Sequence, residues 1–239
     1  MQPRSADGRR VEPGMSASGD RSPDPHGGRP VQRAGPPLER AHEAILLVHG
    51  RGASADDIMA LGRELVVGPA ADRTALLAPE AAGHAWYPES FLSPIARNEP
   101  WLSSGLARLE ALREEAAAAG IPAHAVAVAG FSQGACLATE FVARHPARYR
   151  ALLAFTGGLI GPPLMEFSHE GDLGGMPAYL SAGDRDPHVP WRRMEATREV
   201  LERMGARVTL RRWPGRPHTI LRREVEEARG LLAAAAGRA

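Results

Sequence analysis

The sequence is short of several residue types, and each shortage excludes a class of protein. Only one of its 239 residues is a cysteine, Cys136, so no disulfide can form within the chain. Lysine is absent, so arginine supplies all 29 basic residues, and 28 acidic residues reduce the formal net charge to +1. A chain this close to neutral has no overall field that would attract a nucleic acid. We therefore expect no disulfide scaffold and no nucleic-acid partner.

Long hydrophobic runs are missing as well. No stretch of 18 apolar residues occurs, and a helix needs about 20 such residues to cross a bilayer. The first 30 residues also lack the apolar segment of a secretory signal peptide. These absences predict a cytoplasmic protein without a membrane span.

Apolar periodicity is nearly absent from residues 1–38, which are rich in Gly, Pro, Arg, Ser and Asp. Such a segment cannot bury enough apolar surface to offset the entropy lost on ordering. We expect a disordered tail over 1–38, followed by one folded domain over 39–239, which is long enough for a sizeable core.

Strand-like and helix-like segments alternate after the tail. Short apolar runs typical of buried parallel strands occur at 45–48, 74–78, 126–129, 151–155, 178–181 and 208–212. Helical patterns cover 54–66, 100–119, 133–145, 191–204 and 224–236, and a long loop covers 79–98. This alternation predicts an α/β fold with a mostly parallel central sheet, helices on both faces and no large cap domain.

A Gly-x-Ser-x-Gly motif stands at residues 130–134, between an apolar strand and a helical pattern. On a strand-to-helix turn this motif forms the nucleophile elbow of serine hydrolases, in which the serine hydroxyl stands clear of the sheet. Ser132 is therefore the candidate nucleophile. Taken alone, the motif is also compatible with an ordinary serine in a glycine-rich turn.

Candidate acid and base residues follow the later strands, where functional groups of parallel sheets collect. His218 follows the last predicted strand, and an imidazole of pKa about 6.5 suits proton transfer near neutrality. Asp184 and Asp186 both follow the preceding strand. Either carboxylate could orient the imidazole while the other caps the turn. The order Ser, Asp, His is the chain order of α/β-hydrolase triads.

An acyl-transfer site also needs two N–H donors for the oxyanion. The backbone of Gln133, the residue after the serine, supplies one, and the loop His-Gly-Arg-Gly at 49–52 is expected to supply the other. Neither a metal-ligand spacing nor a phosphate-binding loop is present, so we expect no metal and no cofactor. Candidates for the substrate pocket are apolar residues in loops at the same edge of the sheet: Trp86, Tyr87, Leu159 and Ile160.

Four motifs together resemble the phospholipase/carboxylesterase branch of the α/β-hydrolases, which includes acyl-protein thioesterases and small bacterial carboxylesterases. They are His-Gly-x-Gly at 49–52, Gly-x-Ser-x-Gly at 130–134, Gly-Asp-x-Asp-Pro-x-Val-Pro at 183–190 and Gly-x-x-His at 215–218. The resemblance covers about residues 42–236.

The resemblance implies that Asp186, rather than Asp184, is the triad acid. It also implies that the backbone N–H of Arg51 is the second oxyanion donor. Many members carry a small or aliphatic residue at the position of Arg51. The guanidinium here either favours an acidic group on the substrate or lies in solvent.

The resulting hypothesis is a serine carboxylesterase that hydrolyses short- to medium-chain esters of small molecules through an acyl-enzyme. Acyl-protein thioesterase or lysophospholipase activity is an alternative, since the same triad performs these reactions. A non-catalytic binding protein of the same fold is another, against which the complete Ser, Asp and His set argues. Members of this branch often form dimers, so the resemblance also implies a homodimer, although no sequence feature marks an interface.

Overall fold

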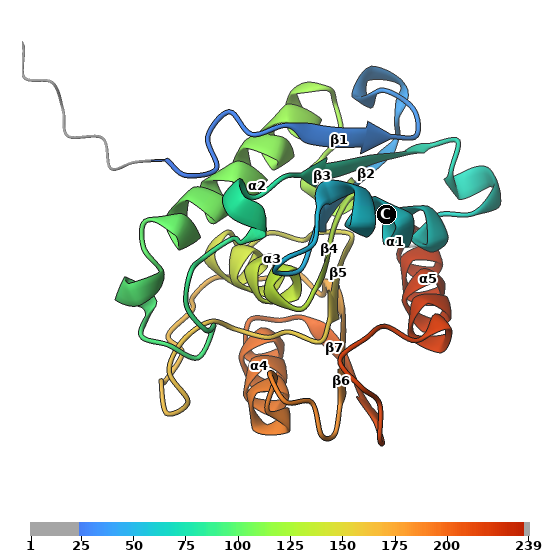
Figure 1. Cartoon of the computed structure of the whole chain (residues 1–239). Coiled ribbons are helices and arrows are strands. Elements are labelled where there is room, and N and C mark those ends of the chain that lie inside the picture. The colour runs from blue at the N-terminus through green and yellow to red at the C-terminus, as the bar shows by residue number, and fades with distance from the viewer. Residues whose placement is uncertain (1–23, 237–239) are drawn as a thin grey trace, which may run out of the picture.

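A computed structural model describes residues 24–236, in which seven strands form one sheet (Figure 1). The strand order is β1-β3-β2-β4-β5-β6-β7, and every neighbouring pair is parallel except β1 and β3. The strands are β1 (Val31–Ala34), β2 (Glu43–Val48), β3 (Thr74–Pro79), β4 (Val126–Phe131), β5 (Ala151–Phe155), β6 (Pro177–Gly183) and β7 (Arg207–Trp213).

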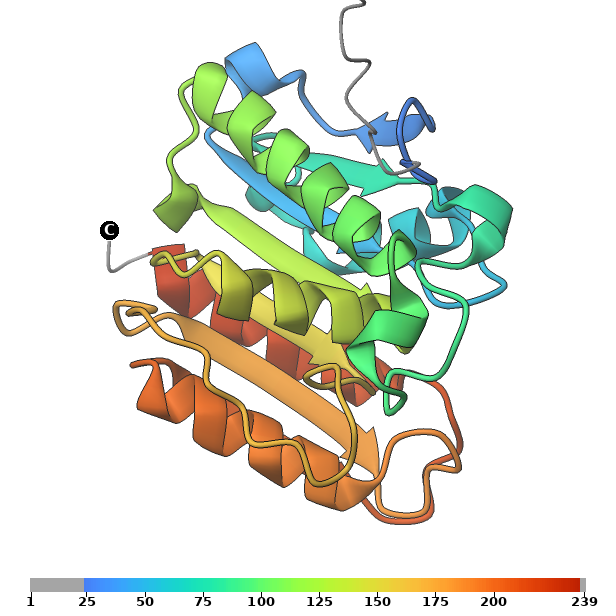
Figure 2. The ribbon, with the colours of Figure 1, turned by 90° about the vertical axis from the view of Figure 1, so that its left-hand side faces the viewer.

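Helices cover both faces of this sheet. They are α1 (Ala55–Leu65), α2 (Trp101–Ala118), α3 (Gln133–Arg144), α4 (Trp191–Arg203) and α5 (Arg222–Ala236). One face carries α2, α3 and α4, and the other carries α1 and α5 (Figures 1 and 2). The predicted arrangement of a mostly parallel sheet between two layers of helices is confirmed.

The core strands are apolar because both of their faces are covered. All residues of β2 and β3 are buried, as are all of β5, which explains why these strands read as continuous apolar runs rather than as alternating patterns. Helix α1 begins with a capping box, since Ser54 Oγ accepts from the N–H of Asp57 at 3.3 Å and the Asp57 carboxylate accepts from the N–H of Ser54 at 2.8 Å.

The register of the sheet brings the ends of four strands together. Phe131 of β4 lies beside Phe155 of β5, which in turn lies beside Ser181 of β6. Gly183 of β6 lies beside Trp213 of β7. The segments that follow these strands therefore meet at one edge, as expected for parallel strands.

The predicted tail over 1–38 is wrong for its second part. Val31–Ala34 form β1, which pairs antiparallel with β3, and His26 is fully buried. The amino-acid composition did not indicate this strand because the strand is short, lies at the lateral edge of the sheet and is only half apolar. Residues 1–23 lie outside the described residues. Within the described part of the chain, no helix is long and apolar enough to cross a membrane.

Candidate active site

Ser132 stands on the turn between β4 and α3. Its backbone has φ 54° and ψ −120°, and its N–H donates to the carbonyl oxygen of Phe155 at 2.9 Å. The turn lies tightly against β2: a Cβ on Gly134 would come within 2.1 Å of the carbonyl oxygen of Val48. Only glycine fits at that position. The turn leaves Ser132 at the carboxyl end of β4, directly before the first residue of α3.

Ser132, His218 and Asp186 form one hydrogen-bonded chain. The Nε2 atom of His218 lies 2.8 Å from Ser132 Oγ, and its Nδ1 atom lies 2.7 Å from Asp186 Oδ2. Asp184 points elsewhere, since its carboxylate accepts from the N–H of Gly215 at 2.8 Å. The fold therefore brings three of the predicted residues together and turns the carboxylate of the alternative acid toward Gly215.

The environment of Asp186 keeps its carboxylate ionised. Burial is the largest influence and opposes ionisation, but hydrogen bonds from the N–H groups of His188 and Val189 and from His218 outweigh it, so the pKa of Asp186 lies below its usual value. An anionic Asp186 accepts Nδ1–H of His218, which leaves Nε2 free to accept the proton of Ser132.

Two backbone N–H groups beside Ser132 are available as oxyanion donors. Arg51 and Gln133 line the same cavity as Ser132, and no backbone hydrogen bond within residues 24–236 uses the N–H of either. Gln133 is the first residue of α3, where helix N–H groups lack intrahelical partners. The first turn of α3 thus presents, next to Ser132, an N–H donor without a backbone acceptor among the described residues.

His49 orients the donor of Arg51. Its buried ring contacts the carbonyl oxygen of Gly50 through Nδ1 at 2.8 Å and accepts the N–H of Ala81 through Nε2 at 3.1 Å. Burial lowers the pKa of His49, so the ring is neutral and Nδ1 is the donor. Because C=O and N–H point in opposite directions across a trans peptide, holding the Gly50 carbonyl turns the Arg51 N–H away from His49.

The side chain of Arg51 is exposed, as one of the two expectations had it, and its guanidinium also bonds to the protein. Its guanidinium donates to the carbonyl oxygens of Tyr87, Pro88 and Glu89 at 2.7, 2.9 and 2.7 Å. The Gln133 side chain donates to the carbonyl of Tyr87 as well, at 2.8 Å. Arg51 therefore holds the loop that forms one wall of the site, through three of its five guanidinium N–H donors.

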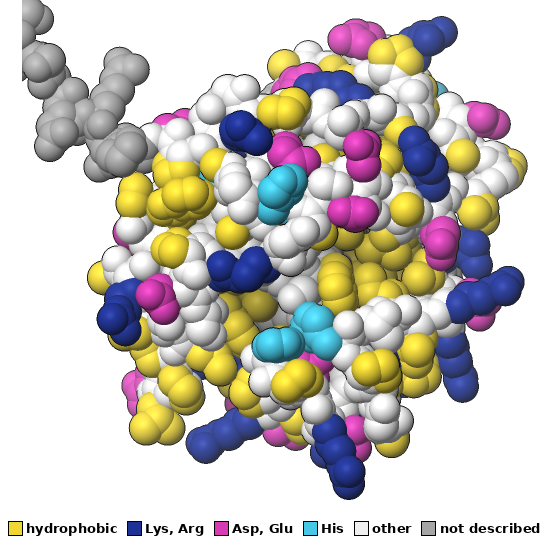
Figure 3. All heavy atoms as spheres, viewed as in Figure 1, with side chains coloured by type: hydrophobic (Ala, Val, Ile, Leu, Met, Phe, Trp, Pro, Cys, Tyr) yellow, Lys and Arg dark blue, Asp and Glu magenta, His cyan; other side chains and the backbone are white. Residues whose placement is uncertain are grey.

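Ser132 opens onto a cavity of about 620 Å³. Figure 3 shows a hollow on this side of the molecule, with hydrophobic side chains inside it and histidine side chains at its border. The cavity is lined by Arg51, Tyr87, Pro88, Glu89, Ser90, Phe91, Leu92, Ser132, Gln133, Cys136, Pro187, His188, Val189 and His218.

Three of the four residues predicted to line the pocket do not line it. Trp86, Leu159 and Ile160 are each 0% exposed and belong to the core, whereas Tyr87 does line the cavity. The prediction failed because it treated apolar loop residues as facing solvent, while these loops fold back onto the sheet. Trp86, for example, donates its indole N–H to the carbonyl of His49 at 2.9 Å.

Sequence reasoning missed other residues of the cavity wall. Phe91, Leu92 and Val189 supply its larger apolar side chains, together with the small Cys136. Val189 lies within the motif at 183–190, and Phe91 lies in the long loop at 79–98. No sequence pattern in an irregular loop tells which of its residues face the site. Burial raises the pKa of the Cys136 thiol to about 12, which makes it an inert part of the wall.

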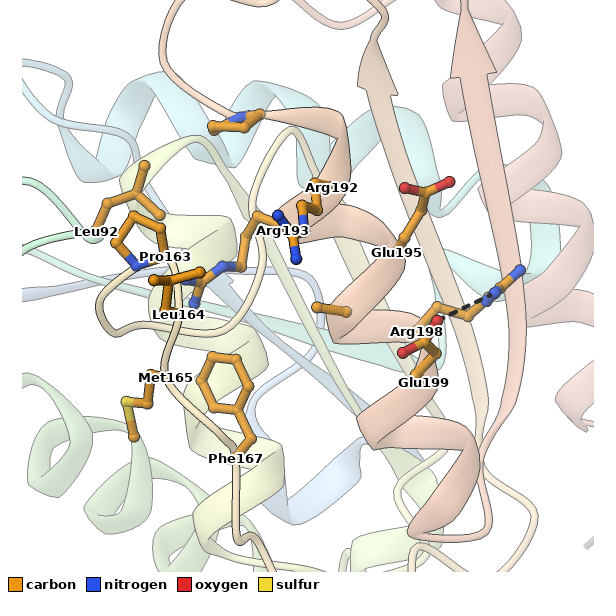
Figure 4. A pocket seen from close by; sticks show the side chains of 12 residues that line it. Leu92, Pro163, Leu164, Met165, Phe167, Arg192, Arg193, Glu195, Arg198 and Glu199 are labelled. Atoms are coloured by element: carbon orange, nitrogen blue, oxygen red, sulfur yellow. Dashed lines mark ion pairs between the residues drawn. The ribbon is translucent and has the colours of Figure 1, made fainter.

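A second cavity of about 640 Å³ lies beside the first (Figure 4). It is enclosed by α4 and the loop that carries Pro163, Leu164 and Phe167, and it shares Leu92 with the first cavity. None of Ser132, His218 and Asp186 lines it.

The sequence matches the family model "Phospholipase/Carboxylesterase" over residues 32–235. The chain belongs to this family. The family match confirms the resemblance drawn from the four motifs, the α/β-hydrolase fold and the expectation that the chain is a carboxylic ester hydrolase. No group of three or more His, Cys, Asp or Glu side chains within residues 24–236 could hold a metal ion.

Individual relatives agree with this family. The crystal structure of a phospholipase/carboxylesterase from Dyadobacter fermentans is 39% identical, with a TM-score of 0.80 over 86% of this chain and 97% of that chain. A carboxylesterase from Bacillus cereus, at 21% identity and a TM-score of 0.67 over 87% and 95%, shares the fold. Acyl-protein thioesterase 1 of Neurospora crassa is 27% identical over 120 residues, and the match spans 47% of each chain, about half the length of that relative.

Proposed function

We propose that this phospholipase/carboxylesterase family member is a serine esterase that hydrolyses short- to medium-chain carboxylic esters through an acyl-enzyme. The observation that supports this most directly is the chain of hydrogen bonds of 2.8 and 2.7 Å that joins Ser132, His218 and Asp186 beside a partly apolar cavity. A serine hydroxyl is a poor nucleophile without a base, and this geometry supplies one.

In the acylation step, Ser132 Oγ attacks the ester carbonyl while Nε2 of His218 accepts its proton. The N–H groups of Arg51 and Gln133 hold the oxyanion of the tetrahedral intermediate. The ionised carboxylate of Asp186 stabilises the imidazolium that forms. His218 then gives its proton to the leaving alkoxide, and the acyl group remains on Ser132.

Deacylation repeats these steps with water. His218 takes a proton from a water molecule, and the hydroxide attacks the acyl carbonyl. The same two N–H groups hold the second oxyanion. When the intermediate collapses, Ser132 Oγ regains its proton from His218 and the carboxylic acid leaves. No cofactor is required for either half of the cycle.

The experiment that tests this function is hydrolysis of p-nitrophenyl esters from acetate to palmitate by the wild type and by Ser132→Ala. We expect the wild type to turn over the shorter esters and the variant to show no enzymatic rate, because the nucleophile is missing. Equal rates in both proteins would refute the role of Ser132. A folded wild type that hydrolyses none of the esters would favour the binding-protein alternative.

A second candidate function is hydrolysis of acyl thioesters, which the 27% identity to the Neurospora thioesterase favours. The proposed triad would attack either carbonyl. Comparing kcat/KM for a thioester and an oxygen ester with the same acyl chain and a similar leaving group separates the two. A rate advantage of more than about 10²-fold for the thioester, beyond the advantage in the uncatalysed reaction, would favour the thioesterase. A series of lysophospholipids in the same assay would test the lysophospholipase alternative.

A further inference from the structure

A buried ion pair lies beneath the loop that carries His218, and the proposed catalytic cycle does not use it. The Arg216 Nη1 atom donates to Glu224 Oε2 at 3.1 Å, and the two side chains are only 1% and 0% exposed. Removing two charges from water is unfavourable unless they are paired and hydrogen-bonded. The remaining contacts of the pair therefore indicate what it holds.

Arg216 closes the loop around His218. Its guanidinium donates to the carbonyl oxygen of Thr219, the residue that follows His218, although Arg216 itself lies two residues before the histidine. Its Nη2 atom donates to Thr156 Oγ1 at 2.7 Å, just beyond the end of β5. One side chain thus fixes both flanks of His218 and attaches them to the sheet.

Glu224 anchors the other end of the pair. It lies in the first turn of α5, where a carboxylate is favoured by the helix dipole, and it accepts from the N–H of Leu221 at 2.8 Å. Its second oxygen accepts from Ser181 Oγ of β6 at 2.5 Å. The pair therefore connects the histidine loop with β5, β6 and α5 at once.

The backbone of the loop also lies directly against β6. A Cβ on Gly183 would come within 2.4 Å of the carbonyl oxygen of Arg216. Gly183 is the last residue of β6 and leads into the turn that carries Asp186. The position of His218 relative to Asp186 is therefore set at this contact.

We propose that Arg216 and Glu224 are positioning residues that hold His218 within hydrogen-bond distance of both Ser132 and Asp186. The proposal rests on the proposed function, since it concerns the base of that reaction. Neither residue lines the cavity beside Ser132, so neither is expected to contact substrate. A displacement of about 1 Å in a catalytic group can lower a rate by about 10²-fold, which sets the size of the expected effect.

The test is the double variant Arg216→Met/Glu224→Leu, which replaces the pair by apolar side chains of similar volume. Such replacements often leave a protein as stable as before, because no charge remains buried. The control is Arg211→Met/Glu227→Leu, a more exposed ion pair of 2.8 Å between β7 and α5, in which Glu227 also contacts Tyr179 and Arg223. For p-nitrophenyl butyrate we expect kcat to fall about 10²-fold in the first variant, with KM within about threefold, and no change in the control.

A melting temperature measured alongside separates positioning from stability. Wild-type kcat in a folded Arg216→Met/Glu224→Leu protein would overturn the proposal. If that protein does not fold, Thr156→Val removes the acceptor of one guanidinium bond with almost no change of shape. We then expect kcat to fall about threefold to tenfold at unchanged KM, and an unchanged kcat would count against the proposal in the same way.

The outcome is distinguishable from a failure of the proposed function. If the wild type hydrolyses no ester, the rate at which a fluorophosphonate labels Ser132 replaces kcat, because that reaction also needs His218 as base. Equal labelling rates in the wild type and the double variant would overturn the positioning role alone. No labelling of the wild type would overturn both proposals.

Discussion

His26 offers the sharpest test of how the N-terminal segment is attached to the domain. Its side chain is 0% exposed. Nδ1 accepts the N–H of Ala82 at 3.1 Å, and Nε2 donates to the carbonyl oxygen of Trp86 at 3.0 Å. The ring also packs against Trp86 and Trp101, with centroid distances of 5.1 and 5.4 Å. These contacts require the neutral imidazole with its proton on Nε2.

The substitution His26→Ala removes two hydrogen bonds and leaves a void beside two indole rings. Each hydrogen bond contributes about 1 kcal/mol, and the lost packing adds about 1–2 kcal/mol, so we expect a destabilisation of about 3–4 kcal/mol. For a domain of this size that corresponds to a fall in Tm of about 6–16 °C. The exposed His124 supplies the control, His124→Ala, for which we expect a change of no more than about 0.5 kcal/mol.

The effect of pH gives an independent check. Burial is the main cause that lowers the pKa of His26 from its ordinary value of 6.5, and the hydrogen bond to Trp86 only partly opposes it. The unfolded chain therefore binds a proton more readily than the folded chain, and stability is lost as the pH falls through 6.5. At pH 5.5 this linkage removes up to about 1.4 kcal/mol relative to pH 7.5.

Denaturant unfolding of wild type and variant at pH 7.5 and 5.5 measures both effects. We expect His26→Ala to destabilise the protein less at pH 5.5, by up to about 1.4 kcal/mol, because the alanine has no proton to bind. A destabilisation that is the same at both pH values would refute the argument that the ring is held neutral. An unchanged Tm would refute the attachment itself.

Three further predictions concern the wall and the edge of the site. Arg51→Ala should raise KM by about tenfold or less and leave kcat within about threefold in steady-state kinetics, because the proposed donor is a backbone N–H; a kcat loss of about 10²-fold would contradict this. Gly183→Ala should lower kcat by about 10-fold to 10²-fold, since its Cβ would meet the Arg216 carbonyl at 2.4 Å, while Gly230→Ala, with no atom within 4 Å, should leave kcat unchanged. Iodoacetamide should alkylate Cys136 at least about 10³-fold more slowly in the folded protein than in denaturant, because burial raises the pKa of its thiol from 9.0 to about 12. Mass spectrometry measures the two rates, and equal rates would disprove this.

Much of the fold could be predicted because its central strands are buried on both faces. Their continuous apolar runs stand out from the helical periodicities between them, and the motifs follow these strands at the same edge of the sheet. Ser132 and His218 could be proposed for that reason, whereas only the family resemblance chose Asp186 over Asp184. Their places depend on the order of the elements, which the sequence makes visible.

The cavity wall could not be predicted in the same way. Whether Trp86 faces the core and Phe91 the cavity depends on how one irregular loop folds, and Arg51 and Gln133 fix that loop through its carbonyl groups. Such contacts have no sequence period. β1 was missed for a related reason, since a four-residue edge strand is defined by its partner β3 and hardly at all by its own composition.

The backbone of Ser132 sets stability against activity at a single residue. A φ of 54° with a ψ of −120° is a conformation that glycine adopts without strain, whereas a residue with a side chain is strained by about 1–3 kcal/mol. The domain would therefore be more stable with glycine at the place where the proposed chemistry needs a hydroxyl. If the proposed role is right, Ser132→Gly yields a protein that melts at a higher temperature than the wild type and has no turnover. Ser132→Ala, which keeps the Cβ, lacks that gain in stability.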